Sequence, residues 1–126
     1  MPTRFVDGET PLVQFDPQLE TSPFALFRLL REGRPPLLID VRSGPGPLGL
    51  KGSIPYPGPE WSPPADADVV LFDDDGSLAV DGARHMQAAG HPRVKALFGG
   101  LELYEFSLDP EVVGEETYLE RREPAT

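Results

Sequence analysis

The stretch Val69-Val70-Leu71-Phe72-Asp73-Asp74-Asp75-Gly76-Ser77-Leu78-Ala79 decides the fold of this chain. Its first four residues are apolar on both sides of an extended backbone, which is the pattern of a central parallel strand covered on both faces. An acidic turn follows, and then the start of a helix. Because open α/β sheets bind ligands in the loops at the carboxyl ends of their strands, the three aspartates lie where a functional site is expected.

Apolar strands and amphipathic helices alternate along the chain on both sides of this stretch. A second double-sided apolar run predicts a strand at Leu37–Val41, and a further strand is predicted at Val94–Phe98. A short edge strand is predicted at Leu12–Phe15. The predicted helices span residues 23–32, about 78–89 and 101–106. Strands separated by helices pair in parallel through right-handed crossovers. The fold class is therefore α/β, with a small, mostly parallel sheet flanked by helices.

The first predicted helix carries signals at both of its ends. Thr21 or Ser22 can cap its N-terminus, and Gly33 fits just past its C-terminus. After the strand that follows this helix, the glycine- and proline-rich stretch Ser43–Gly49 predicts a loop.

Length and charge limit the classes of protein to which the chain can belong. Its 126 residues indicate one domain, with a core at about residues 12–106 and a C-terminal tail at 107–126. It has no cysteine, which excludes a disulfide scaffold and a thiolate nucleophile. Its net charge of -10 disfavours nucleic acid and anionic membranes and leaves a basic partner as an alternative to simple solubility. We expect a cytoplasmic protein, because no apolar run approaches the roughly 20 residues of a membrane span and the N-terminus lacks the apolar core of a signal peptide.

Four segments, in order, resemble the pattern of one family. The pattern has a strand that ends in Asp-Val-Arg, a Gly-x-Ile-Pro segment, an apolar strand followed by a turn with glycine, and a last strand followed by Gly-Gly and a helix. The segments are Leu37–Arg42, Gly52–Pro55, Val69–Gly76 and Gly90–Glu102. On these segments the chain, from about Leu12 to Phe106, resembles a rhodanese-like domain of the sulfurtransferase superfamily. Ser53 stands where this family has histidine, and Tyr104 stands where tryptophan is common.

The resemblance also implies what the loop after the third strand can do. In active members a cysteine begins this loop and takes sulfur as a persulfide, while backbone amides and an arginine of the loop hold the anion. Aligning the loop glycine with Gly76 places Asp73 at the cysteine position and Leu78 where the arginine is often found. A carboxylate cannot form a persulfide, and acidic side chains repel an anionic substrate. The resemblance thus implies a catalytically inactive domain, without a cofactor, that acts as a binding or regulatory module for an unidentified protein partner.

The predicted binding loop consists of six consecutive residues. They are Asp73, Asp74, Asp75, Gly76, Ser77 and Leu78. Asp40 and Arg42, at the end of the neighbouring strand, are expected to form a hydrogen-bond network that supports this loop. Since no base is predicted beside Ser77, we interpret it as the N-cap of the next helix rather than as a nucleophile.

A second family resemblance competes for the same stretch. Four apolar residues followed by Asp-x-Asp-Gly-(Ser/Thr)-Leu resemble the first motif of the haloacid dehalogenase superfamily. This resemblance implies a magnesium-dependent phosphohydrolase with Asp73 as nucleophile and Asp75 as general acid. Against it, only 51 residues follow Asp75 (126 minus 75), and Lys95 is the only later lysine. Cation binding by the loop Asp73–Asp75, without catalysis, is a further alternative.

Three more side chains have conspicuous chemistry but receive structural interpretations. His85 and His91 do not have the spacing of metal ligands, so we expect them to be solvated. Trp61, the only tryptophan, follows several prolines and is expected to cover the core. The sequence gives no indication of the oligomeric state.

Overall fold

The computed structural model describes residues 15–42 and 48–121. Five strands form one parallel sheet in the order β1-β6-β5-β2-β4. They are β1 (Glu20–Thr21), β2 (Leu37–Asp40), β4 (Ile54–Pro55), β5 (Val69–Phe72) and β6 (Val94–Leu97). The helices are α1 (Pro23–Arg31), α2 (Ser77–Ala88), α3 (Gly100–Ser107) and α4 (Pro110–Val113). The predicted α/β class with a mostly parallel sheet is confirmed.

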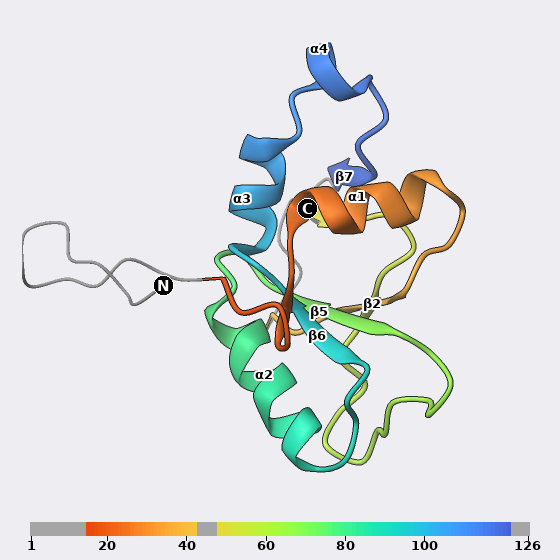
Figure 1. Cartoon of the computed structure of the whole chain (residues 1–126), viewed down its shortest axis with the longest axis vertical. Helices are drawn as coiled ribbons and strands as arrows, with labels where there is room; N and C mark the ends of the chain where they lie inside the picture. Colours follow the sequence, from red (N-terminus) through yellow and green to blue (C-terminus); the bar gives the residue numbers. More distant parts are fainter. Residues whose placement is uncertain (1–14, 43–47, 122–126) are drawn as a thin grey trace, which may run out of the picture.

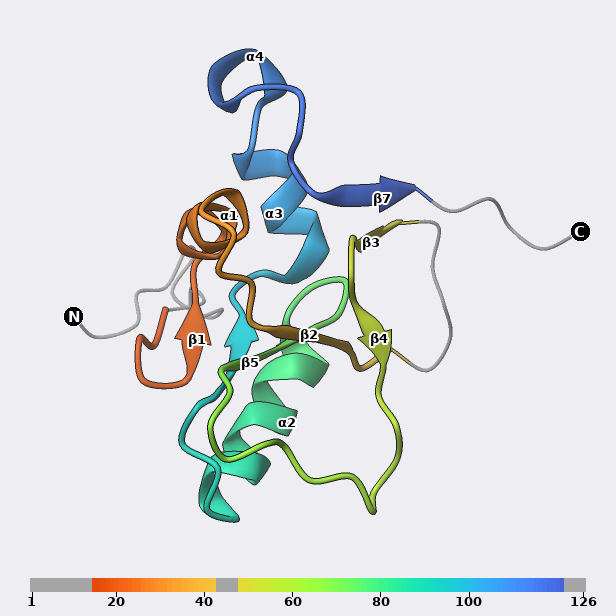
Figure 2. The ribbon, with the colours of Figure 1, turned by 90° about the vertical axis from the view of Figure 1, so that its right-hand side faces the viewer.

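The sheet is covered by helices on both of its faces (Figures 1 and 2), with α2 on one face and α1 with α3 on the other. The central strand β5 supplies side chains to both sides in alternation. Val69 and Leu71 belong to the cluster that includes alanines of α2, whereas Val70 and Phe72 pack with residues of α1 and α3. The four apolar residues of β5 are buried, as the double-sided pattern predicted.

Close packing of α2 on β5 accounts for a glycine in the middle of that helix. A Cβ atom at Gly82 would lie 3.0 Å from the Leu71 Cδ1 atom. Glycine there lowers helix propensity by about 1 kcal/mol relative to alanine, but it allows α2 to approach the strand. Ala79 and Ala83, both fully buried, serve the same close approach.

Helix α1 begins and ends as its sequence signals predicted. The Ser22 hydroxyl oxygen accepts a hydrogen bond from the Ala25 amide at 3.2 Å, so Ser22 is the N-cap, and Thr21 belongs to β1. Gly33, just past the helix, has a φ of 73°. At α2, by contrast, the prediction that Ser77 is the N-cap is wrong. The N-cap is Gly76, with a φ of 91°, and Ser77 is the first helical residue.

Two predictions near the N-terminal part of the chain differ from the structure. Most of the predicted edge strand Leu12–Phe15 lies outside the described residues. Its one described residue, Phe15, is not in a strand, and the edge of the sheet is formed by β1 instead. The predicted loop Ser43–Gly49 lies mostly outside the described residues too, but its last two residues belong to strand β3 (Leu48–Leu50). The loop prediction is wrong at that end.

Strand β3 pairs antiparallel with β7 (Leu119–Arg121) in a second, two-stranded sheet (Figure 2). This pairing attaches the segment after α3 to the rest of the domain. Leu108 is buried in the core beneath α1 and α3, and the Tyr104 hydroxyl donates a hydrogen bond to the Thr117 carbonyl oxygen at 2.7 Å. Within the described ranges, no helix has the length and apolar character needed to span a membrane.

Candidate functional site

The candidate loop lies at the carboxyl edge of the parallel sheet, where β5 leads into α2 (Figure 1). Strand β2 ends beside it, and α3 begins beside it after β6. This is the edge at which parallel α/β sheets place their ligand-binding loops. The structure therefore brings together the end of β2, the loop of β5 and the first turn of α3.

Asp73, the first residue of the loop, is buried with 2% of its surface exposed. One carboxylate oxygen, Oδ1, accepts a hydrogen bond from the Gly76 amide at 2.7 Å. The other, Oδ2, accepts one from the Leu78 amide at 2.8 Å. These amides belong to the start of α2, where backbone N–H groups lack partners within the helix. The Asp73 carboxylate thus occupies the position of an anion in a cradle of backbone amides.

Burial and hydrogen bonding act in opposite directions on the protonation of Asp73. Burial is the largest influence and raises the pKa of Asp73 above its ordinary value. The amides of Leu78 and Gly76 lower this pKa, because they favour the charged form, and the nearby charge of Asp75 raises it again. The balance is a raised pKa, so the cradle binds the carboxylate but does not fully compensate its removal from water.

Asp75 lies in the same loop but has a different environment. Its Oδ1 atom accepts hydrogen bonds from the amide of Ser77 at 2.9 Å and from the hydroxyl of Ser77 at 2.7 Å. Asp75 is exposed, and these two bonds lower its pKa. The Ser77 hydroxyl is therefore used within the turn.

Arg42 joins the end of β2 to the loop. Its Nε and Nη2 atoms donate to the two carboxylate oxygens of Asp40 at 2.9 and 2.8 Å, and its Nη1 donates to Asp74 at 3.0 Å. The side chain of Arg42 is 7% exposed. The structure thus contains the hydrogen-bond network expected for Asp40 and Arg42, and the guanidinium is engaged by two carboxylates.

Helix α3 is attached to the loop by backbone contacts. The amides of Leu101 and Glu102 donate to the carbonyl oxygens of Asp73 and Asp74, each at 2.9 Å. The approach is so close that a Cβ atom at Gly100 would lie 2.5 Å from the Asp74 carbonyl carbon. The loop is therefore bound at both of its sides, by Arg42 and by α3.

Comparison with solved structures identifies this architecture. The chain superposes with a TM-score of 0.58 and 29% sequence identity on reduced Bacillus anthracis CoADR-RHD, over 74% of this chain. It matches a protein from Bacillus halodurans with a TM-score of 0.59 at 19% identity. It also matches a rhodanese-related protein from Thermoplasma volcanium with a TM-score of 0.55 at 14% identity.

This chain adopts the rhodanese-like fold.

The extent of these matches differs between the solved structures. The matched region is only 17% of the Bacillus anthracis protein, so the chain corresponds to a small part of that protein. The match with the Bacillus halodurans protein covers 71% of this chain and 73% of that protein. The match with the Thermoplasma volcanium protein covers 71% of this chain and 92% of that protein. No family model matches the sequence. No curated protein matches it either.

Asp73 and Leu78 are the two loop positions at which the sequence departs from the cysteine and the arginine of the rhodanese-like pattern. The resemblance in sequence places Asp73 at the nucleophile position, and the structure places it at the end of β5, where the loop begins. Leu78 is 55% exposed, and it contributes its backbone amide to the cradle rather than a charged side chain. An arginine contacts the loop from a different element, because Arg42 at the end of β2 donates its Nη1 hydrogen to Asp74.

The loop offers little to a metal ion as it stands. Residues 15–42 and 48–121 contain no group of three or more acidic, histidine or cysteine side chains arranged to hold one. The two candidate metal ligands are Asp73 and Asp75. Both carboxylate oxygens of Asp73 accept hydrogen bonds from backbone amides. His85 is exposed and His91 is half-buried. Trp61 is half-buried against the core on the α2 side, as expected of a residue that covers it.

Gly99 and Gly100 also contact the loop. Sequence reasoning did not include these two glycines in the site. It also gave no indication that the loop amides find an acceptor within the loop. The spacing contained a signal, because an aspartate that ends a strand three residues before a glycine can reach the amides of the helix that follows. The orientation of those amides, however, depends on the left-handed backbone at Gly76.

Proposed function

We propose that this chain is a catalytically inactive rhodanese-like domain that acts as a binding or regulatory module. The observation that carries the proposal is the buried Asp73 carboxylate, whose two oxygens are bonded to the Gly76 and Leu78 amides. The sequence resemblance assigns this residue to the nucleophile position. A carboxylate has no sulfur with which to form a persulfide. The amides that could stabilise a substrate anion already have an acceptor from the chain itself.

The charge around the loop supports the same proposal. Asp74 and Asp75 are exposed beside the cradle, so a thiosulfate ion would meet negative charge as it approached. Arg42 could offset this charge only by leaving Asp40 and Asp74, which occupy three of its nitrogen atoms. Sulfur transfer would need both a nucleophile and an anion site, and the loop as built provides neither.

The phosphohydrolase alternative requires Asp73 to attack a phosphorus atom. A nucleophile must reach its substrate, and 2% exposure with both oxygens bonded prevents this in the described conformation. No contact of the described residues favours this alternative over an inactive domain.

A sulfurtransferase assay tests the proposal directly. With thiosulfate and cyanide we expect no turnover by the wild-type chain above that of a heat-denatured sample. The matched variant Asp73→Cys provides a nucleophile and releases both amides. Its thiolate would attack the outer sulfur of thiosulfate, break the S–S bond and release sulfite, so we expect mass spectrometry to detect a gain of one sulfur atom. Turnover by the wild-type chain would overturn the proposal.

A phosphatase assay covers the second class of enzyme. With an aryl phosphate and magnesium chloride we expect no hydrolysis by the wild-type chain. Hydrolysis that disappears in Asp73→Asn but persists in Asp81→Asn, an exposed aspartate on α2, would replace the proposal with the phosphohydrolase alternative.

A further inference from the structure

A partly exposed apolar surface lies beside the loop. Phe106 of α3 is 84% exposed, and Leu78 at the start of α2 is 55% exposed. Phe98 is half-buried between the ends of these helices, where its ring meets that of Phe15 at a centroid distance of 5.3 Å. We refer to Leu78, Phe98 and Phe106 as the apolar rim.

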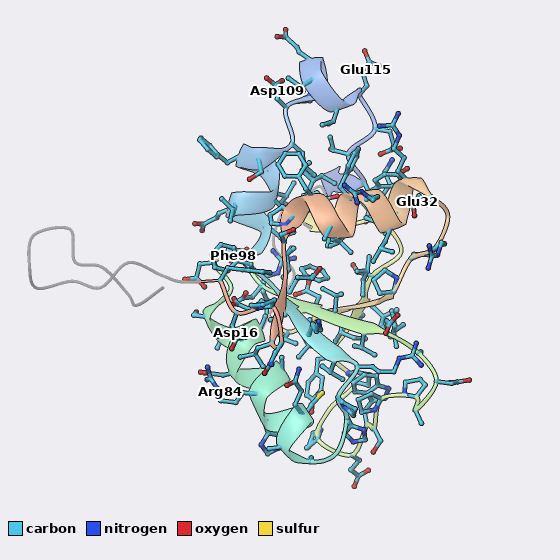
Figure 3. The ribbon with its side chains drawn as sticks, viewed as in Figure 1. Asp16, Glu32, Arg84, Phe98, Asp109 and Glu115 are labelled. Atoms are coloured by element: carbon cyan, nitrogen blue, oxygen red, sulfur yellow. The ribbon has the colours of Figure 1, made fainter. Side chains whose placement is uncertain are left out.

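Backbone contacts show that the rim is continuous with the loop. A Cβ atom at Gly76 would lie 3.0 Å from the Gly99 amide nitrogen, so the turn before Leu78 touches the turn after Phe98. Glu102 follows on α3, and its amide is bonded to the Asp74 carbonyl oxygen. Phe106 is four residues further on, so it shares a helix face with Glu102. Figure 3 shows Phe98 at the base of α3, with Asp109 and Glu115 beyond the other end of this helix.

The exposed side chains of Phe106 and Leu78 favour burial against a partner, since a large apolar side chain gains free energy on removal from water. Phe106 has no such partner within the described residues and makes no contribution to the two core clusters. The core therefore does not account for its identity.

The charge around the rim selects the kind of occupant. Asp74, Asp75 and Glu102 are exposed beside it. The side chain of the adjacent cation, Arg42, is 7% exposed and already bonded to Asp40 and Asp74. The whole chain carries a net charge of -10. A second copy of this chain, or an anionic membrane, would therefore bring like charges together at this surface.

We propose that the apolar rim and the carboxylates of Asp74, Asp75 and Glu102 form a docking site for a basic amphipathic segment of a partner protein. Apolar side chains of the segment would cover Leu78 and Phe106, and its lysines or arginines would meet the three carboxylates. Peptide-binding surfaces commonly have apolar side chains at their centre and charged or polar side chains at their margin. The inference rests on the proposed function, and it specifies the chemistry of the bound partner.

The test uses a synthetic helical peptide of leucine and lysine as the probe, with binding followed by fluorescence anisotropy. We expect the variants Phe106→Ser and Glu102→Gln each to weaken binding at least five-fold. The matched controls are Val112→Ser and Glu115→Gln. Val112 is 80% exposed on α4, and Glu115 is an exposed glutamate at the same distant end of the molecule. Both controls should bind within two-fold of the wild-type chain.

Several outcomes would overturn the inference. Equal weakening by Glu102→Gln and Glu115→Gln would show attraction to net charge alone. Equal binding of a peptide with glutamate in place of lysine would remove the requirement for a basic partner. Sedimentation of the wild-type chain as a dimer that Phe106→Ser dissociates would make a second copy the occupant, and no binding of the lysine peptide would exclude the site. Because the experiment contains no substrate, its failure is distinct from the failure of catalytic inactivity, which only turnover would reveal.

Discussion

Two strand-to-helix junctions lie side by side at the carboxyl edge of the sheet, and they satisfy their helix amides in different ways. From β5 into α2, the amides of Gly76 and Leu78 are bonded by a side chain, the carboxylate of Asp73. From β6 into α3, the amides of Leu101 and Glu102 are bonded by backbone carbonyl oxygens of the neighbouring loop. In both helices the N-cap is a glycine with a left-handed backbone, Gly76 for α2 and Gly99 for α3.

The difference teaches where this fold can change and where it cannot. A junction held by a side chain can be altered by substituting one residue, so its chemistry is free to vary. A junction held by carbonyl oxygens depends on the approach of two backbones, and almost every side chain is too large for it. The comparison predicts unequal effects of substitution, which we give from the largest to the smallest.

The backbone junction should be the less tolerant of the two. In Gly100→Ala the new Cβ atom would meet the Asp74 carbonyl carbon and oxygen at 2.5 Å, at a φ of 66°. Strain and overpacking together should lower the free energy of unfolding by about 3–5 kcal/mol. Gly33→Ala is the control, because its φ of 73° is similar but no atom lies within 4 Å, and it should cost about 1 kcal/mol. Urea denaturation measures both, and equal losses would show that the close approach has no energetic effect.

Substitution at the junction held by the Asp73 side chain should lower the free energy of unfolding by a smaller amount, and an added carboxylate should restore part of it. Asp73→Ala removes the acceptor of two amides, and it also removes a carboxylate that is costly to bury. The net loss should be about 2 kcal/mol. Asp74→Asn changes the exposed neighbour and its ion pair with Arg42, and should cost about 0.5 kcal/mol.

A small carboxylate in solution should replace the missing side chain in Asp73→Ala. We expect sodium formate to raise the melting temperature of this variant more than sodium chloride does at equal ionic strength. The wild-type chain should show no such difference, because its own carboxylate fills the cradle. An equal response of the two proteins would mean that the amides no longer converge once Asp73 is gone.

The smallest expected effect is a difference in pH dependence within the loop. Burial raises the pKa of Asp73 in the folded chain, so its contribution to stability is fully present below its unfolded value of about 3.9. This contribution is lost as the pH rises through the folded pKa. For Asp75, bonded by Ser77, the pKa is lowered, so its contribution is present above the unfolded value and is lost as the pH falls. The stability difference between the wild-type chain and Asp73→Asn should therefore shrink as the pH rises from below about 3.9 through the raised pKa of Asp73 in the folded chain.

Thermal melts of Asp75→Asn provide the opposite comparison. The advantage of the wild-type chain over this variant should grow across the same rise in pH. Two variants with parallel pH profiles would contradict the assignment of opposite pKa shifts to Asp73 and Asp75.

Much of the fold was accessible from local sequence. Double-sided apolar runs predicted β2 and β5 to within about one residue, because burial on both faces leaves a pattern that needs no knowledge of the rest of the chain. The segment Val94–Phe98 likewise predicted β6. Ser22 and Gly33 likewise marked the ends of α1. The pairing of β3 with β7 was not accessible, because two three-residue strands far apart in the sequence carry no local signal for each other.

The position of the candidate site could be predicted from the sequence, but its hydrogen bonds could not. The spacing to Gly76 placed Asp73 at the start of the loop, and the structure agrees with that placement. The direction of the amides of Gly76 and Leu78 follows from a left-handed turn and from the contact with Gly99 and Gly100, neither of which a residue pattern specifies. Sequence reasoning therefore did not predict that Asp73 is buried and bonded within the loop, whereas Asp74 and Asp75 face the solvent.

The attachment of α2 and α3 to two consecutive residues has a consequence for exchange with solvent. The amides of Gly76 and Leu78 have their acceptors on the side chain of Asp73, and those of Leu101 and Glu102 on the carbonyls of Asp73 and Asp74. One opening event that displaces this dipeptide would release all four hydrogens together. Deuterium uptake at these four positions should thus share a single opening free energy and behave as one cooperative unit, although the sequence divides them between two helices.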